Sequence, residues 1–328
     1  MSYTKCIFEL FKFLAVFQLS IFFPVNGKKD KDDNNIVLPQ TNLLMIMFDD
    51  LRPELSIYGK NHMITPNFER LAKRSVIFDY AFAQVAVCNP SRDSLLTGLR
   101  PDTVGTYNFQ HSFRPHLSIP SQLARSGYNT AGIGKLFHWD GNDKGIWNYF
   151  QWDNDWYDYQ NKENNFMNSS AMPDKYRHES GFRDHQFAER AANVLTKISK
   201  EKQHFMLAIG FKLPHLALHV PYKHYLLYKD KVKQQAWHLT KRELRFPPSV
   251  SEVSYRCCAD PEYRFMREEG SLRFNRSVRL GDINMAFTNE MRDELMMSYC
   301  AGVTFADQQM VTHLQCHYSY HHLSIQLE

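Results

Sequence analysis

A continuous apolar run at residues 42–48 constrains the fold of this chain more than any other feature. It reads Asn-Leu-Leu-Met-Ile-Met-Phe, has the length of a strand and shows no polar alternation. Such a run is typical of a strand that is buried on both faces of a parallel sheet. The run ends abruptly at Asp49 and Asp50. We therefore expect two carboxylates at the carboxyl end of a central strand.

Helical patterns alternate with strand patterns along the rest of the chain. Proline near a helix start, glycine near a helix end and apolar residues at helical spacing mark the helices. The expected helices cover about residues 65–72, 118–127 and 182–198, and the further strands cover residues 128–134 and 204–210. This order predicts an α/β fold with a largely parallel central sheet flanked by helices.

Polar residues that could take part in catalysis or ligand binding follow these strands or open a helix. Ligands of open α/β sheets bind at the edge formed by the carboxyl ends of the strands. We therefore expect one pocket to contain Asp49, Asp50, Cys88, Lys135, His138 and His215. Taken singly, each has a simpler interpretation, because aspartates at a strand end cap turns and loop lysines are usually solvated.

Composition places the chain among ordinary globular proteins. It has 328 residues, of which 43% are hydrophobic and 23% charged, and this balance argues against wholesale disorder. Neither a Gly-rich phosphate loop nor zinc-type cysteine spacing occurs, and nothing supports nucleic-acid binding. Two segments with little periodicity, about residues 139–175 and 222–282, are expected to be long surface excursions.

The amino terminus has the pattern of a secretory signal peptide. Lys5 precedes an apolar stretch at residues 13–23, and small residues follow at 25–27. The stretch is shorter than the ~20 residues of a membrane span, so no span is expected after cleavage; an uncleaved anchor is the alternative. We expect a signal peptide at residues 1–27 and a polar leader at residues 28–41.

Entry into the endoplasmic reticulum agrees with other features. Asn168 and Asn275 begin acceptor triplets for N-glycosylation. The formal charge of +4 and the 15 histidines suit a polyanionic substrate in an acidic compartment. Pairing stays open among the cysteines that remain when Cys6 and Cys88 are set aside, which are Cys257, Cys258, Cys300 and Cys316.

The segment 88–98 reads Cys-Asn-Pro-Ser-Arg-Asp-Ser-Leu-Leu-Thr-Gly. Pro90 fits the first turn of a helix and Gly98 fits its end. Cys88 is therefore expected at a helix amino terminus, where free N–H groups and the helix dipole favour an anion. The alternative is that Cys88 is a small buried hydrophobic residue.

The pentapeptide 88–92 resembles the Cys-x-Pro-Ser-Arg signature of the sulfatase family. The resemblance implies an alkaline-phosphatase-like sulfatase fold and oxidation of Cys88 to formylglycine by the formylglycine-generating enzyme. The hydrated aldehyde would be the nucleophile that attacks sulfur, and its second hydroxyl would allow sulfate to leave. Arg92 would steady the modified side chain and its charge.

Asp49-Asp50 resembles the paired aspartates with which sulfatases bind a divalent cation. The resemblance implies a metal site that comprises Asp49, Asp50 and the modified Cys88. Oxygen ligands of this kind suit Ca²⁺ or Mg²⁺, and the cation would polarise a sulfate oxygen.

Segment 134–138, Gly-Lys-Leu-Phe-His, resembles the Gly-Lys-x-Phe-His of the iduronate-2-sulfatase group within this family. The resemblance implies that Lys135 neutralises sulfate oxygens in the transition state. It also implies that His138 holds the diol or helps to expel sulfate.

Segment 210–215, Gly-Phe-Lys-Leu-Pro-His, resembles the Gly-Tyr/Phe-x-Lys-Pro-His of the same group. His215 would then donate a proton to the leaving alcohol. Leu213 stands where the group has lysine, and Lys212 lies one position early, so no role is transferred to Lys212.

The resemblance extends over residues 42–315 and implies an incomplete catalytic domain. In the family, the helix that matches residues 295–314 leads to an Asp-His-Gly metal motif, which this sequence lacks. We therefore expect the carboxy-terminal part of the fold to be missing and residues 316–328 to form an unmatched tail.

Two functions follow from the resemblance. The first is a lysosomal or secreted sulfuric ester hydrolase that removes 2-O-sulfate from iduronate in dermatan or heparan sulfate, so that its partner is a sulfated glycosaminoglycan. The second is a catalytically inactive, truncated sulfatase-like protein. A phosphatase or phosphodiesterase is a distant third, because those relatives carry serine or threonine where Cys88 stands.

Overall fold

The computed structural model describes residues 41–109, 118–138, 145–151, 179–215, 218–231 and 289–318. The chain divides into two compact units, residues 1–42 and 43–328. Every helix and strand below belongs to the second unit. The expected signal peptide, the leader before residue 41, both glycosylation triplets and the chain end after residue 318 lie outside the described residues.

Within the described residues, four parallel strands form the sheet of this unit. They are β1 (Leu43–Phe48), β2 (Asn129–Gly134), β3 (Tyr149–Gln151) and β4 (Phe205–Phe211). Their order is β1-β4-β2-β3, so the chain crosses over between neighbouring strands. In the register of β4, Met206 pairs with Leu43 on one side and with Thr130 on the other. The predicted parallel α/β architecture is confirmed.

Burial is deepest at β4 and β2, and not at β1. All seven residues of β4 and all six of β2 are buried, because each strand has described neighbours on both sides. In β1 only Met47 is buried, and Leu43 is 39% exposed. The expectation that residues 42–48 are buried on both faces is therefore wrong. Among the described residues, β1 has a strand partner on one side only.

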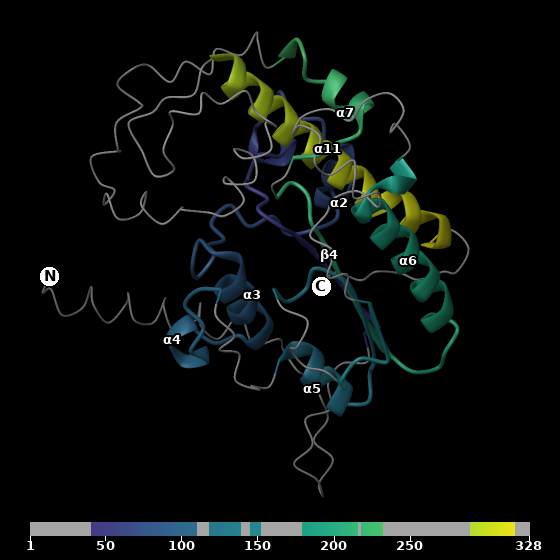
Figure 1. Ribbon diagram of the computed structural model, residues 1–328. Helices are drawn as coiled ribbons and strands as arrows, with labels where there is room; N and C mark the ends of the chain where they lie inside the picture. Colours follow the sequence, from purple (N-terminus) through teal and green to yellow (C-terminus); the bar gives the residue numbers. More distant parts are fainter. Residues whose placement is uncertain are drawn as a thin grey trace, which may run out of the picture. The chain divides into compact units, whose positions relative to one another are not determined.

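Helices cover both sides of the sheet. Helix α6 (Arg183–Ile198) packs Phe187, Ala191 and Leu195 against the apolar side chains of β2 and β4. On the other side lie α3 (Cys88–Thr97), α4 (Pro101–Val104) and α5 (Ile119–Arg125), as Figure 1 shows. The side-chain oxygen of Ser118 accepts the Ser121 N–H at 3.2 Å and caps α5, which agrees with the helix start predicted there.

The long helix α11 (Asn289–Tyr318) joins parts of the fold that are distant in sequence. It packs on α6, on α7 (Tyr222–Leu226) and on α2 (Pro66–Ala72), as Figure 1 shows. Phe305 of α11 lies in a second apolar core beneath these helices, together with Phe182 and Tyr228.

Two short elements lie in segments expected to be irregular. Strand β3 falls within residues 139–175, and helix α7 falls within residues 222–282. Both are too short to give a periodic pattern, so packing against neighbouring elements decides them. The rest of these two segments is largely outside the described residues.

Two further findings concern the cysteines and the membrane. Cys88 and Cys300 carry free thiols, whereas the side chains of Cys257, Cys258 and Cys316 lie outside the described part. No helix within the described residues is both long enough and apolar enough to cross a bilayer.

Candidate active site at the carboxyl edge of the sheet

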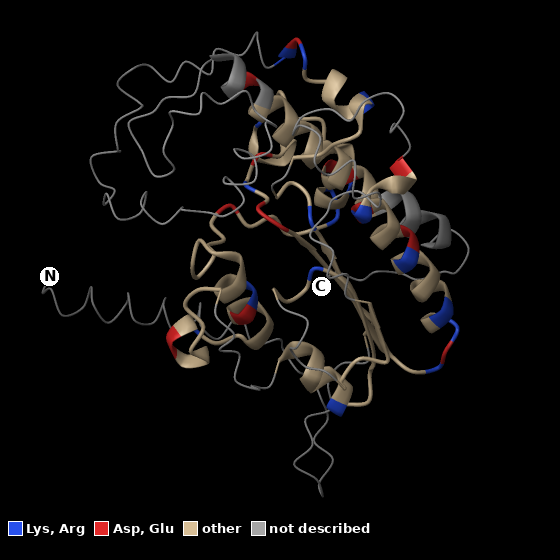
Figure 2. Cartoon of the chain, in the orientation of Figure 1, with Lys and Arg blue, Asp and Glu red and all other residues tan. Residues whose placement is uncertain are grey.

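Segments that follow three strands meet the start of α3 at one edge of the sheet. Figure 2 shows uncharged strands with acidic and basic residues gathered at their ends. Asp49 and Asp50 follow β1, Lys135 and His138 follow β2, His215 follows β4, and Cys88 and Arg92 lie on α3. This is the edge at which ligands of open α/β sheets bind.

Two glycines allow the strand ends to approach closely. Gly134 and Gly210 pair in register at the carboxyl ends of β2 and β4. A Cβ atom at Gly210 would overlap the backbone carbonyl of Lys135, and one at Gly134 would overlap the carbonyl of Gly210. Gly134 also has φ 72°, which L side chains rarely adopt. The Lys135 N–H then donates to the Gly210 carbonyl at 2.8 Å.

Asp49 is the centre of the charge network. The residue is 2% exposed, Arg92 Nη2 donates to its Oδ1 at 2.7 Å, and Lys135 Nζ pairs with its Oδ2. Burial by itself would raise the pKa of Asp49, but Arg92 and Lys135 hold that pKa well below its usual range. Asp49 is therefore ionised throughout the physiological range.

Arg92 ties α3 to the loop after β2. Its Nη1 donates to the carbonyl of Lys135 at 2.5 Å and to the carbonyl of Leu136 at 3.1 Å. Together with the bond to Asp49, these contacts hold the guanidinium rigidly inside the site. A planar, permanently charged group in this position suits the recognition of a tetrahedral oxyanion.

His215 lies close to both carboxylates. Its Nε2 is 3.8 Å from Asp49 Oδ2 and 3.7 Å from Asp50 Oδ2. The turn that carries this histidine is fixed by Asp184 of α6, whose carboxylate accepts the N–H groups of Lys212 and Leu213, each at 2.8 Å. Leu213 is 2% exposed and lies in the apolar core, so its side chain adds no charge to the site.

Cys88 is the first residue of α3 and is half-buried. Burial raises the pKa of its thiol to about 11, although Lys135 and Arg92 act in the opposite direction. Cysteines that act as nucleophiles have lowered pKa values. At physiological pH the unmodified thiol of Cys88 is therefore protonated and a poor nucleophile.

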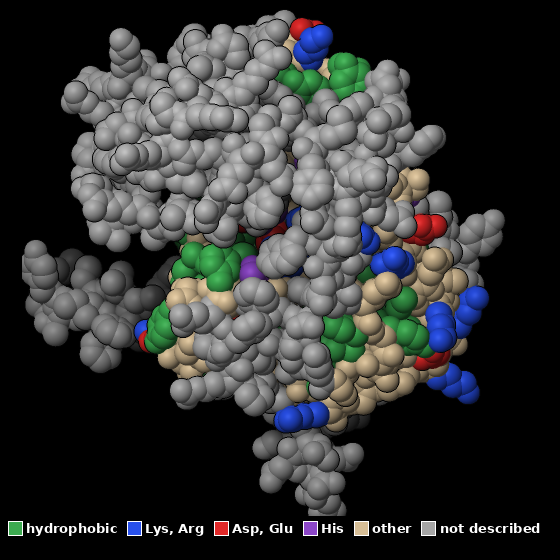
Figure 3. Space-filling view, in the orientation of Figure 1, with side chains coloured by type: hydrophobic (Ala, Val, Ile, Leu, Met, Phe, Trp, Pro, Cys, Tyr) green, Lys and Arg blue, Asp and Glu red, His purple; other side chains and the backbone are tan. Residues whose placement is uncertain are grey.

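His138 is buried beside an aromatic side chain at the surface. Its ring lies 5.0 Å from the ring of Phe109, which is 47% exposed. Burial, and then the charge of Lys135, lower the pKa of His138 to about 4. The imidazole is therefore neutral above that pH. Figure 3 shows hydrophobic side chains gathered beside a histidine on this face, with acidic side chains close by.

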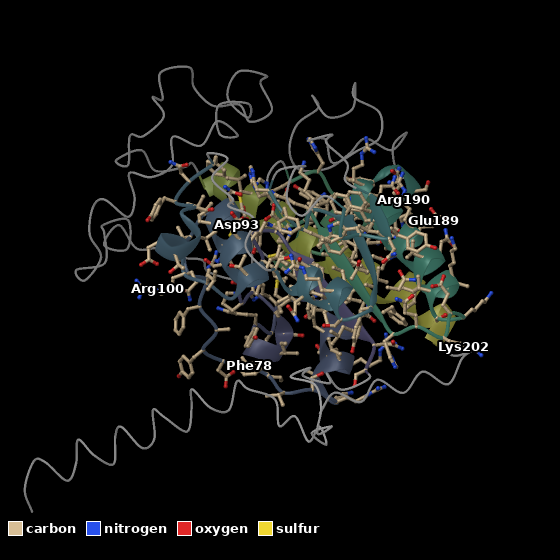
Figure 4. All side chains as sticks on the ribbon, turned by 90° about the horizontal axis from the view of Figure 1, so that it is seen from below. Phe78, Asp93, Arg100, Glu189, Arg190 and Lys202 are labelled. Carbon is tan, nitrogen blue, oxygen red and sulfur yellow. The ribbon has the colours of Figure 1, made fainter. Side chains whose placement is uncertain are left out.

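Side chains of α3 hold the segment that carries Phe109. Asn89 Nδ2 donates to the carbonyl of Asn108 at 2.7 Å, and the Thr106 hydroxyl donates to Asp93 at 2.8 Å. Figure 4 shows Asp93, which is buried, on α3, and Arg100, whose side chain is exposed, at the surface. No local sequence pattern points to Phe109, because its contact with His138 depends on this tertiary arrangement.

The donor set suits a hard divalent cation in kind. Two adjacent carboxylates are oxygen ligands of the type that Ca²⁺ and Mg²⁺ prefer. Asp49 already forms ion pairs with Arg92 and Lys135. Within the described ranges, no group of three or more His, Cys, Asp or Glu side chains is arranged so that it could hold a metal ion. Ca²⁺ takes about 6–8 oxygen ligands, and Asp49 and Asp50 would supply only some of them.

Comparison with known proteins places these features in one family. The family model named Sulfatase matches residues 41–314. Iduronate 2-sulfatase of Homo sapiens is 31% identical over 292 residues, which cover 82% of this chain and 50% of that protein. N-sulphoglucosamine sulphohydrolase of Homo sapiens is 38% identical over 100 residues, 29% of this chain and 20% of that protein. The chain spans about half the length of the iduronate 2-sulfatases that it matches.

Solved structures share the fold. A protein determined in complex with its substrate D-glucosamine-2-N,6-O-disulfate aligns with a TM-score of 0.54 at 19% identity and covers 85% of this chain and 62% of its own. The phosphonate monoester hydrolase of Agrobacterium radiobacter aligns with a TM-score of 0.52 at 16% identity, over 85% of this chain and 59% of its own. At these identities the likeness concerns the fold alone, and with the family match it confirms the fold expected from the sequence.

Proposed function

The chain belongs to the sulfatase family, and from this premise we propose that the site around Cys88 hydrolyses sulfate esters of sugars. One observation carries the proposal. The thiol of Cys88 lies at the amino terminus of α3 among Lys135, Arg92 and Asp49, and burial raises its pKa to about 11. Because the unmodified thiol is protonated and a poor nucleophile, modification of residue 88 would supply a better nucleophile beside the cationic side chains of Lys135 and Arg92.

We propose that the modification is formylglycine, made in the secretory pathway by the formylglycine-generating enzyme. When formed, the hydrated aldehyde supplies a hydroxyl that attacks sulfur and a second hydroxyl that lets sulfate leave. The position of residue 88 supports this proposal, because the free N–H groups of α3 favour negative charge there.

The surrounding residues have separate roles in this proposal. Arg92 and Lys135 would bind the sulfate oxygens and stabilise the charge that develops on them. His215 would donate a proton from Nε2 to the leaving alcohol, and this nitrogen lies 3.7 Å from the Asp50 carboxylate and 3.8 Å from the Asp49 carboxylate. His138, neutral above pH about 4, would hold the modified residue 88 and accept a proton from it.

A divalent cation, Ca²⁺ or Mg²⁺, would be held by Asp49, Asp50 and the oxygen of the modified residue 88. When bound, the cation polarises a sulfate oxygen as a Lewis acid. The ionised state of Asp49 supports this assignment, because metal ligands must be deprotonated.

We propose iduronate 2-O-sulfate in dermatan or heparan sulfate as the substrate. The support is the 31% identity to human iduronate 2-sulfatase over 82% of this chain. Other relatives are named for other sulfated sugars, so the sugar is the finer part of the proposal. We propose a lysosomal or secreted location, and the signal-peptide pattern at residues 1–27 supports entry into the endoplasmic reticulum on the way to it.

A catalytically inactive sulfatase-like protein is the second candidate. Leu213, which stands at the lysine position of the iduronate-2-sulfatase group, is buried in the core, and the described residues bring no third metal ligand together. Such a protein would bind sulfated sugars through Arg92 and Lys135 without turning them over.

Mass spectrometry of the full chain secreted from cells that make formylglycine tests the proposal. The tryptic peptide of residues 75–92 contains residue 88. We expect it to resist alkylation and to react with a hydrazide, as an aldehyde does. An intact, alkylatable thiol would overturn the assignment of the nucleophile.

An activity assay separates the two candidates. We expect the secreted chain to release sulfate from an iduronate 2-O-sulfate disaccharide and Cys88→Ala to abolish this activity. Cys300→Ala removes the other free thiol of the described residues and should leave the activity unchanged. An aldehyde at residue 88 without sulfate release would favour the inactive candidate.

A further inference from the structure

We infer that Tyr299 of α11 is a positioning residue that fixes the turn carrying Asp50 and thereby directs the Asp50 carboxylate into the candidate active site. The inference rests on the proposed function for its catalytic meaning. Its geometric part stands by itself, because it concerns only contacts between α11 and the segment after β1.

The hydroxyl of Tyr299 bridges both ends of a short backbone turn. It donates to the carbonyl of Asp50 at 2.9 Å and accepts the N–H of Arg52 at 2.8 Å. The two groups lie almost 250 residues before Tyr299 in the sequence. One side chain thus satisfies an acceptor and a donor that flank a single residue of the turn.

The turn needs such support because Asp50 has an unfavourable backbone conformation. Its φ of 56° lies in the left-handed region, and among the described residues no other non-glycine residue has a positive φ. Aspartate tolerates this region better than most residues with a Cβ atom, but the conformation still costs free energy that its surroundings must offset. Tyr299 contacts the carbonyl of this residue, so it acts where the strain is located.

The conformation of Asp50 determines where its carboxylate points. Asp50 Oδ2 lies 3.7 Å from His215 Nε2, and Asp49 Oδ2 lies 3.8 Å from the same nitrogen. Consecutive residues of an extended strand point to opposite faces. The left-handed turn at Asp50 breaks that alternation and brings the two neighbouring carboxylates to the same histidine.

The hydroxyl is suited to this role over a wide pH range. Tyr299 is half-buried and packs against the core around Leu55 and Cys300. Burial raises its pKa to about 12, so the hydroxyl keeps its proton at neutral and mildly alkaline pH. The ring fixes the hydroxyl, and α11 fixes the ring.

Tyr299→Phe tests the inference, with Tyr228→Phe as a matched control. Tyr228 is also a tyrosine whose hydroxyl bridges a backbone N–H and α11, since it accepts from Ile64 at 3.0 Å and pairs with Thr304 at 2.5 Å. Its contacts do not involve the turn at Asp50. A general effect of losing a bridging hydroxyl should therefore appear in both variants.

Two measurements on the full-length variants decide the outcome. We expect the crystal structure of Tyr299→Phe to show Asp50 outside the left-handed region, and that of Tyr228→Phe to show it unchanged. We also expect Tb³⁺, a luminescent substitute for Ca²⁺, to bind Tyr299→Phe roughly tenfold more weakly than the wild type, as is typical when an outer-shell partner is lost. Binding to Tyr228→Phe should match the wild type.

The possible failures are distinguishable. If Asp50 keeps its φ and Tb³⁺ binds Tyr299→Phe as it binds the wild type, the inference is wrong and the proposed function stands. If the wild type binds no Tb³⁺ and keeps a thiol at residue 88, the proposed function fails. The φ of Asp50 in Tyr299→Phe then decides by itself whether Tyr299 positions the turn.

Discussion

Burial determines the protonation state of His138, and the ring of Phe109 supplies part of that burial. The two rings are 5.0 Å apart, and burial is the main reason why the pKa of His138 falls from 6.5 to about 4. The imidazole of His138 is therefore neutral at mildly acidic pH. An aromatic side chain at the surface thus contributes to the burial that keeps His138 neutral.

We predict that Phe109→Ala raises the pKa of His138 by on the order of one unit, because water then reaches the ring and stabilises its charged form. The variant would carry more positive charge than the wild type at pH values around 4 to 5, between the pKa of about 4 in the wild type and the raised pKa of the variant. Titration of the His138 ring signals by NMR measures the shift. Tyr107→Ala, an exposed residue of the same segment, is the control, and an equal shift there would contradict the role of Phe109.

At the scale of the elements, the site exists because β2 and β4 end close together. The pair Gly134 and Gly210 removes the side chains that would keep their last residues apart. The loops after these strands then reach Asp49 through Lys135 and His215. Glycine here serves the approach of two backbones rather than flexibility.

We predict that Gly210→Ala lowers the free energy of unfolding by more than about 3 kcal/mol, since the added Cβ would overlap the backbone of Lys135. Urea denaturation measures the loss. Gly302→Ala in α11 is the matched control, because its added Cβ would meet neighbours only at 3.5 Å or more.

The control should be stabilised by about 0.5–1 kcal/mol, as alanine favours a helix interior over glycine. Equal effects of the two substitutions would show that the close approach of β2 and β4 does not limit stability. Loss of stability in both would point to a general intolerance of added volume.

At the scale of the whole molecule, α11 connects the end of the described chain to its beginning. Asp307 accepts the N–H of Phe68 at 2.8 Å and the N–H of Asn67 at 3.1 Å, so it caps α2 from a distance of about 240 residues. Tyr299 reaches the turn after β1 from the same helix. The first α-helix and the first site residues of the described part of the chain are thus held by the last described element.

Asp307 also makes stability depend on pH. Burial raises its pKa from 3.8 to about 6, although the N–H groups of α2 favour the charged form. The folded state then binds this proton more tightly than the unfolded state. The contribution of Asp307 is fully present below pH 3.8 and is lost as the pH rises to about 6.

We predict that Asp307→Asn removes this dependence, because an amide keeps an acceptor for α2 and does not titrate. The free energy of unfolding of the variant, relative to the wild type, should increase as the pH rises through that window. Urea denaturation at several pH values measures it, with the exposed Asp79→Asn as the control. A constant difference across the window would contradict a raised pKa.

Much of the framework was predictable from local sequence. The strands near residues 43–48, 129–134 and 205–211 and the helices that alternate with them follow from hydrophobic runs and from capping residues. The position of Cys88 at a helix start follows from Pro90 and Gly98, and Gly98 indeed ends α3 with φ 69°. These features depend on residues within one or two turns of each other.

Other features were decided only by tertiary structure. The partial exposure of β1, the short strand β3 and the contact of Phe109 with His138 depend on neighbours that no local pattern specifies. The same holds for Tyr299, because its hydroxyl meets Asp50 only after α11 has packed.

The sequence by itself determined which residue types stand at the ends of strands and at the start of α3, and hence the kind of chemistry available. The tertiary structure determined how those groups are charged and oriented. The reason is physical: burial and the distance between charges, which set pKa values and backbone strain, arise only when distant segments pack together.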